Sequence, residues 1–215
     1  MDSLSKDLVV RPEWDAGRVS VSITLGGRTY HVWVAASEEL GREEDFLLPL
    51  ALFPAMISGS RLELPRGVSP RLLSAAPKIQ DVFRLWGEEY WSDTLSGLRP
   101  IAVNAEVRSS PVERAPGVGC FFSDGVDSYY TVLKHRQEVT HIIFVHGFDI
   151  ALEEKVLRSQ ASRMAQEVAR ELGVTLIEAE TNLRSFSDKV VGWASTMERR
   201  WRASPFSSST GLVKF

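Results

Sequence analysis

Between residues 117 and 182, short apolar runs alternate with segments of helical periodicity, and no other feature constrains the fold as strongly. The apolar runs are "GVGCFF" (117–122), "VTHIIFVHGF" (139–148) and "VTLIEAETN" (174–182). The segments between them, "DSYYTVLKHRQ" (127–137) and residues 149–173, have helical patterns. Strands that alternate with helices form a parallel sheet with right-handed crossovers. The sequence therefore predicts an α/β fold in which helices flank a parallel sheet.

The segment 149–173 carries the clearest helical pattern. Asp149 is a suitable first capping residue, and Gly173 is a suitable residue to end the helix. The pattern predicts an apolar stripe of five residues that faces the sheet: Leu152, Val156, Met164, Val168 and Leu172.

The first half of the chain has a different character. Residues 18–25 and 29–36 are β-branched runs separated by "GGR", which predicts a hairpin. Residues 44–59 are apolar but contain two prolines, so we expect a short broken helix or a loop. A helical segment and a short strand, "IAVNAEV" (101–107), follow. The segment "RSSPVERAPGVG" (108–119) is typical of a linker.

This linker predicts two domains. We expect a small α+β domain of unknown function over residues 1–112, a second domain over 113–200, and a disordered tail over 201–215.

The composition excludes several classes of protein. Of the 215 residues, 44% are hydrophobic and 25% are charged, which is the balance of a soluble globular protein. Cys120 is the single cysteine, so no disulfide forms within the chain. No run approaches the ~20 apolar residues of a membrane span, and the start lacks a signal peptide pattern. The net charge is -3, and the basic residues are scattered, so no nucleic-acid surface is indicated. We expect a cytoplasmic protein.

The stretch "FFSDGVDSYY" (121–130) ends the first apolar run in small and acidic residues, directly before a helix. Backbone N–H groups at a helix start, a glycine and serine hydroxyls form a phosphate site, and Asp127 is a suitable Mg²⁺ ligand. The alternative is that the Ser and Asp residues only cap the helix. The stretch matches neither G-x-x-x-x-G-K-[ST] nor G-x-G-x-x-G. Phe121 occupies the first glycine position of G-x-S-x-G, which excludes a hydrolase elbow.

The residues "FFSDGVDSYYTVL" resemble the S-G-G-x-D-S signature of the PP-loop ATP pyrophosphatases, with a strand before the loop and a helix after it. The runs "FVHGFD" and "TNLRSF" resemble bacterial PP-loop proteins close to cyano-deazaguanine synthase. The resemblance covers roughly residues 117 to 195. It implies a Rossmann-like sheet of the HUP type, also called adenine nucleotide alpha hydrolase-like.

The same resemblance implies a reaction. ATP and Mg²⁺ bind, a substrate oxygen attacks the α-phosphate, pyrophosphate leaves, and an amine, ammonia or sulfur captures the adenylated product. Such an enzyme is a ligase or is amidotransferase-like, and its second substrate is an unknown small-molecule acceptor. The positions carried over for the nucleotide are Ser123, Asp124, Gly125, Val126, Asp127, Ser128, Val145, His146, Asn182 and Arg184.

Two departures from the family pattern bear on activity. Asp124 stands at the second glycine of the signature, where a carboxylate repels a triphosphate and restricts the backbone. After Trp193 the expected further strands and helices do not follow, which predicts a truncated domain. A truncated sheet has an unpaired edge, which favours a homodimer. The alternatives to an enzyme are a non-catalytic nucleotide-binding or interaction protein and an inactive truncated fragment.

Overall fold

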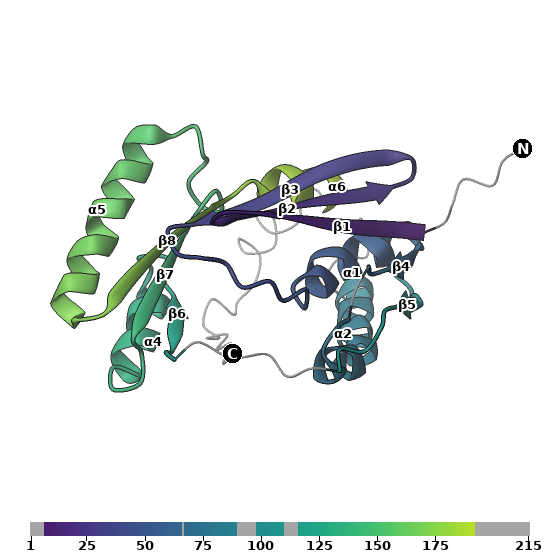
Figure 1. Cartoon of the computed structure of the whole chain (residues 1–215), viewed down its shortest axis with the longest axis horizontal. Coiled ribbons are helices and arrows are strands. Elements are labelled where there is room, and N and C mark those ends of the chain that lie inside the picture. The colour runs from purple at the N-terminus through teal and green to yellow at the C-terminus, as the bar shows by residue number, and fades with distance from the viewer. Residues whose placement is uncertain (1–6, 66, 90–97, 110–115, 192–215) are drawn as a thin grey trace, which may run out of the picture.

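The protein is α/β, and its strands form one mixed sheet. The computed structural model describes residues 7–65, 67–89, 98–109 and 116–191, so the predicted tail and the predicted truncation lie outside it. The sheet has eight strands in the order β5-β4-β1-β2-β3-β8-β7-β6 (Figure 1). Four neighbouring pairs are parallel and three are antiparallel.

The elements of the second half follow the predicted alternation. They are β6 (Gly119–Phe121), α4 (Val126–Lys134), β7 (His141–His146), α5 (Lys155–Leu172) and β8 (Thr175–Thr181), and they are followed by a helix that was not predicted, α6 (Leu183–Val191). Strands β6, β7 and β8 are parallel neighbours. Each successive strand is added on the same side of the last, as in one half of a doubly wound sheet. A Rossmann-like arrangement is consistent with this order.

The first half contributes the other end of the sheet. Its elements are β1 (Asp7–Asp15), β2 (Arg18–Leu25), β3 (Arg28–Ala36), α1 (Leu47–Ser58), β4 (Arg61–Glu63), α2 (Pro70–Glu89) and β5 (Val103–Asn104). Strands β2 and β3 form the predicted hairpin, and Leu25 pairs with Arg28. The two turn residues, Gly26 and Gly27, have φ of 56° and 78°, which glycine adopts without strain.

The two halves meet where β3 and β8 run antiparallel. Val34 pairs with Thr181, and Ala36 pairs with Ala179. Beyond this register the side chain of Asn182 continues the contact, since Oδ1 accepts the Trp33 N–H at 2.8 Å and Nδ2 donates to the His31 carbonyl at 2.9 Å. The sheet therefore crosses the predicted boundary at residues 112 and 113. A separate first domain and a HUP-type second domain stay predictions.

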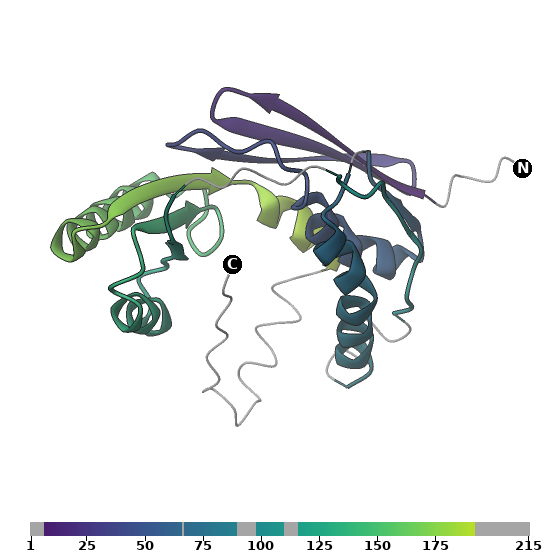
Figure 2. The same ribbon diagram turned by 60° about the horizontal axis from the view of Figure 1, so that its bottom comes forward.

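Different helices cover the two ends of the sheet (Figure 2). At the β1–β3 end, α1, α2 and α6 pack on the face that includes Val32. At the other end, α4 and α5 pack on the face that includes Ile142 and Phe144. The β3–β8 register relates the faces, because Val34 and Thr181 share one face while Glu178 and Glu180 lie on the other, against α5.

Several elements differ from the sequence predictions, and three of them are instructive. First, α1 is one helix of 12 residues and not a broken one, although Pro54 lies inside it. Leu48 and Leu52 are almost fully buried, and burial of this kind outweighs the cost of a proline, about 3 kcal/mol. Second, β1 was not predicted, because "RPEWD" contains proline and charges that are unfavourable in a strand.

Third, α5 begins at Lys155 and not at Asp149. Residues 149–154 form a loop, and Arg158 Nη1 donates to the Leu152 carbonyl at 3.1 Å. The predicted stripe is therefore wrong in part, since Val156 is 72% exposed and Met164 is 47% exposed. Small side chains let the helix approach the sheet closely, and its buried face consists of Ala161, Ala165, Val168, Ala169 and Leu172. Gly173 ends the helix in the left-handed conformation, as predicted.

Among the described residues, no helix combines the length and the hydrophobicity that a membrane span requires.

Candidate functional site

The loop of residues 123–128 lies between the carboxyl end of β6 and the start of α4. Its first residue, Ser123, is exposed, and Gly125 is the N-cap of α4 with extended backbone angles, φ -88° and ψ 160°. The first N–H groups of a helix have no acceptor within the helix, so those of residues 126–128 are available to an anion, whereas the Tyr129 N–H donates to the Gly125 carbonyl. Val126 itself is 84% exposed, which leaves this helix start open to solvent.

Asp124 occupies the position of the second signature glycine, and its backbone is left-handed. Its φ is 62°, a conformation that glycine adopts freely and that Asp tolerates better than most residues. The carboxylate accepts a hydrogen bond from the Tyr129 hydroxyl at 3.0 Å. Burial, followed by this bond and the Asp124 charge, raises the pKa of the Tyr129 phenol. Asp124 therefore fits the turn, and its carboxylate is held against α4.

Of the other loop side chains, Ser128 forms a hydrogen bond within the loop, whereas Asp127 faces solvent. Ser128 Oγ donates to the Gly125 carbonyl at 2.7 Å, so this hydroxyl supports the turn. The Asp127 carboxylate is exposed and forms no ion pair within the described ranges. Those ranges contain no cluster of three or more His, Cys, Asp or Glu side chains arranged for a metal. The role of Asp127 as a Mg²⁺ ligand therefore stays a prediction.

A cavity of about 250 Å³ lies at the carboxyl ends of β6 and β7, beside this loop. Its walls are mostly apolar and aromatic, and Ser123 and Asp149 supply polar atoms. The lining residues are Phe121, Phe122, Ser123, Ile143, Phe144, Val145, His146, Phe148, Asp149 and Ile150. Two of the carried-over positions at the end of β7, Val145 and His146, thus lie at this cavity.

Of the loop positions only Ser123 lines it, and the carried-over positions after β8, Asn182 and Arg184, do not. Asn182 uses both ends of its amide on β3. Arg184 Nη1 donates to the Phe148 carbonyl at 2.6 Å, and Nε lies 3.6 Å from Asp188 Oδ2. Both side chains are thus engaged in holding backbone and neighbouring side chains in place. Arg184 still bears on the cavity, because it fixes the loop that forms one wall.

Position 147, directly after β7, has room only for glycine. Its φ is 95°, and a Cβ at this position would overlap the Thr181 carbonyl oxygen. The close approach brings the end of β7 against the end of β8 and lets the chain turn into the loop 148–154. Any larger residue here would distort the cavity wall.

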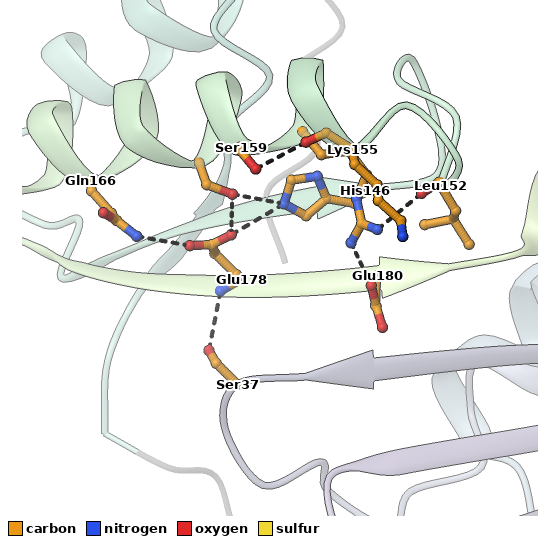
Figure 3. A network of polar contacts seen from close by, with 10 residues as sticks. Ser37, His146, Leu152, Lys155, Ser159, Gln166, Glu178 and Glu180 are labelled. Carbon is orange, nitrogen blue, oxygen red and sulfur yellow. Dashed lines mark hydrogen bonds and ion pairs between the residues drawn. The ribbon is translucent and has the colours of Figure 1, made fainter.

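His146 belongs to a polar network on the α5 face of the sheet (Figure 3). Its side chain is only 6% exposed, and Nε2 lies 3.1 Å from Glu178 Oε2 and 3.2 Å from Ser162 Oγ. Ser162 donates to the same Glu178 oxygen at 2.7 Å, and Gln166 donates to the other at 3.2 Å. The family resemblance implied that His146 contacts the nucleotide, but these contacts direct its imidazole toward α5 and β8.

The network fixes the charge of Glu178. Burial alone raises the pKa of its carboxyl, but the hydrogen bonds from Ser162, His146 and Gln166 outweigh burial, and the pKa lies below its ordinary value. An ionised carboxylate can only accept hydrogen bonds, so the proton between His146 Nε2 and Glu178 Oε2 is bonded to Nε2. The other ring nitrogen, Nδ1, is buried and has no hydrogen-bond partner in the described part of the chain.

Ser162, His146 and Glu178 have the residue types of a hydrolase triad but not its geometry. A triad uses both ring nitrogens, one for the serine and one for the acid. Here the serine and the acid both meet Nε2. The cluster is therefore not a proton relay for a nucleophile.

A second and larger cavity, about 560 Å³, opens beside this network. It lies between the end of β3, β8 and the first turns of α5, and His146 reaches it from β7. Four residues of α5 (Lys155, Arg158, Ser159 and Ser162) face residues 178–180 of β8 and residues 35–37. Arg158 Nη2 forms an ion pair with Glu180 Oε2 at 2.5 Å. We term this the β8–α5 cavity.

The β8–α5 cavity was not predicted from the sequence, although the spacing of two glutamates in β8 is an indication of it. In "LIEAET", Glu178 and Glu180 are two residues apart, so both point from one face of the strand. Half-buried carboxylates are favoured next to hydrogen-bond donors. Arg158 and Ser162, four residues apart on one side of α5, supply them.

Comparisons with models of known families, with curated proteins and with solved structures found no match.

Proposed function

We propose that this protein binds ATP with Mg²⁺ in the manner of a PP-loop protein. The observation that carries the proposal is the 250 Å³ cavity at the carboxyl ends of β6 and β7, which adjoins the loop 123–128. In open parallel sheets, ligands bind at this end of the strands. The left-handed backbone at Asp124 supports the comparison with the signature, since it lies where the signature has a glycine.

Different residues would contact different parts of the nucleotide. The aromatic wall formed by Phe121, Phe122 and Phe148 is suited to stacking on a purine. The first N–H groups of α4 and the Ser123 hydroxyl donate to phosphate oxygens. Asp127 would hold the Mg²⁺ ion, which would neutralise phosphate charge and so favour departure of pyrophosphate. Adenylation of a small-molecule acceptor is the reaction that this arrangement would serve.

A second candidate, nucleotide binding without turnover, has its own support. The described lining of the cavity contains no lysine or arginine, and Arg184 is engaged with Phe148 and Asp188. Phosphoryl chemistry depends on cations that stabilise developing charge. Release of pyrophosphate therefore separates the two candidates, whereas ATP binding is common to both.

The test is thermal unfolding of the full chain with Mg-ATP. A ligand that binds only the folded state stabilises it by about 2.7 kcal/mol at roughly 100 times its Kd. We expect a saturable rise in Tm that Ser123→Ala weakens and that Ser74→Ala, an exposed serine on α2, leaves unchanged. Absence of a rise at millimolar Mg-ATP in the folded wild type contradicts the proposal.

Asp124→Asn sharpens the test. Asparagine tolerates the left-handed backbone but removes a negative charge beside the phosphates. A charge at a distance of about 4 Å in water contributes about 1 kcal/mol. We therefore expect Asp124→Asn to bind ATP roughly fivefold more tightly. Equal or weaker binding by this variant, measured by calorimetry, argues against phosphates at this loop.

A further inference from the structure

We infer that the β8–α5 cavity is a second ligand site, and that it takes a small zwitterion bearing an ammonium and a carboxylate, of the class of free α-amino acids. The cavity volume of about 560 Å³ exceeds that of the cavity proposed for the nucleotide. The inference rests on the lining of this cavity and does not depend on ATP binding.

The cavity lining carries equal numbers of positive and negative side chains, and the two signs lie on opposite walls. Lys155 and Arg158 place two positive charges on the α5 wall, and Glu178 and Glu180 place two negative charges on the β8 wall. A balanced lining of this kind gives little net attraction to a simple anion or cation. It is complementary to a molecule that carries both charges at a short separation.

Groups of both signs remain to be satisfied in the cavity. On the donor side, the Lys155 ammonium makes no ion pair among the described residues, and Arg158 Nε is buried without an acceptor. On the acceptor side, Glu180 uses Oε2 on Arg158, and its Oε1 has no partner in the same ranges. A buried polar atom without a partner costs about 1–3 kcal/mol, which applies to Arg158 Nε, whereas the Lys155 ammonium and Glu180 Oε1 are open to a ligand that enters from solvent.

His146 is the second, independent observation. Its side chain is more than nine-tenths buried, it lines the cavity, and its Nδ1 has no hydrogen-bond partner in the described part of the chain. Because Nε2 is engaged with Glu178, Nδ1 is the ring nitrogen that remains for a contact with a ligand. The ammonium of a zwitterion supplies donors, and its carboxylate accepts from Lys155 and Arg158.

The experiment uses the full chain and each of the common L-α-amino acids in turn, at millimolar concentration. The readouts are Tm and the imidazole NMR signals, which are few because the chain has four histidines. We expect at least one amino acid to raise Tm saturably and to shift the His146 ring signals. The amine that lacks its carboxylate, and the acid that lacks its ammonium, should bind about tenfold more weakly or worse.

Lys155→Ala and a matched control test the location. Lys155 is exposed on the first turn of α5, so its loss leaves the fold intact, and it should weaken binding about tenfold or more. Arg163→Ala, an exposed position of the same helix that does not line the cavity, should leave binding unchanged. The inference is overturned if no amino acid changes either readout, if the one-charge analogues bind equally well, or if Lys155→Ala binds like wild type.

Discussion

The two ends of the sheet are held by different means. At the β1–β3 end, large aliphatic side chains from α1 and α2 close a core in which Leu8, Leu48 and Ile23 have no exposed surface. At the β6–β8 end, alanines bring α5 close to the strands, and the space near β8 is filled by the His146–Glu178 network. The larger apolar core supplies stability, whereas the second end carries the cavities and the ionisable groups. Strand β8 belongs to both ends.

The comparison predicts the largest loss of stability in the apolar core. Truncation of a fully buried leucine removes its transfer free energy and leaves a cavity, so Leu48→Ala should lower the free energy of unfolding by about 2–5 kcal/mol. Leu157→Ala on α5 is the control, since Leu157 is 49% exposed, and it should cost less than ~1 kcal/mol. Chemical denaturation of both variants measures the difference. Equal losses of unfolding free energy in the two variants would show that the apolar core does not contribute more stability than the exposed side of α5.

Gly147→Ala addresses the close approach of β7 and β8. The added Cβ overlaps the Thr181 carbonyl oxygen, so we expect a loss of about 1–3 kcal/mol from overpacking, in addition to backbone strain. The matched control is Gly173→Ala, which has a φ of 70° but nothing within 4 Å of the new Cβ, and which isolates the strain. If the two variants unfold at the same denaturant concentration, the overlap at Gly147 is relieved without cost.

Glu178→Gln tests whether the polar network stabilises the second end. The folded pKa of Glu178 lies below its ordinary value, so ionisation contributes stability that is present above the unfolded pKa and is lost as the pH falls through the folded one. We expect Glu178→Gln to cost about 1–3 kcal/mol at neutral pH and progressively less below pH 4.5, the ordinary value of the carboxyl. Tm as a function of pH measures this.

The exposed Glu167 of α5 provides the control for that profile. Its side chain has no partner among the described contacts, so Glu167→Gln should shift Tm by little at any pH. A constant difference between Glu178→Gln and wild type across the acid range would show that the charge of Glu178 contributes nothing.

Local patterns predicted the elements of this fold better than their assembly. The hairpin 18–36 and the strand–helix alternation after residue 117 follow from β-branched runs, glycine turns and helical spacing, all of which act over a few residues. The start of α5 was misplaced because Asp149 is an adequate cap, and the Arg158 contact that holds the preceding loop is tertiary. The pairing of β3 with β8 could not be predicted, since no local signal selects a partner so far along the chain.

The same division applies to the candidate sites. The loop 123–128 was placed correctly between a strand and a helix because its composition is local. The family resemblance implied that Asn182 and Arg184 contact the nucleotide, but the positions of β3 and of the Phe148 carbonyl, which engage them, depend on the assembled fold. The β8–α5 cavity requires β3, β8 and α5 together, and only the spacing of Glu178 and Glu180 indicated it beforehand.

The β3–β8 pairing has a consequence for the chain as it leaves the ribosome. Strand β3 ends at Ala36, and its partner β8 begins at Thr175. At ordinary rates of synthesis, on the order of ten seconds pass before that partner emerges. During this interval the hairpin of β2 and β3 presents an unpaired edge, which is a template for pairing with other nascent chains. This protein therefore depends on delayed closure of its own sheet, and slow or paused translation between these strands should favour aggregation.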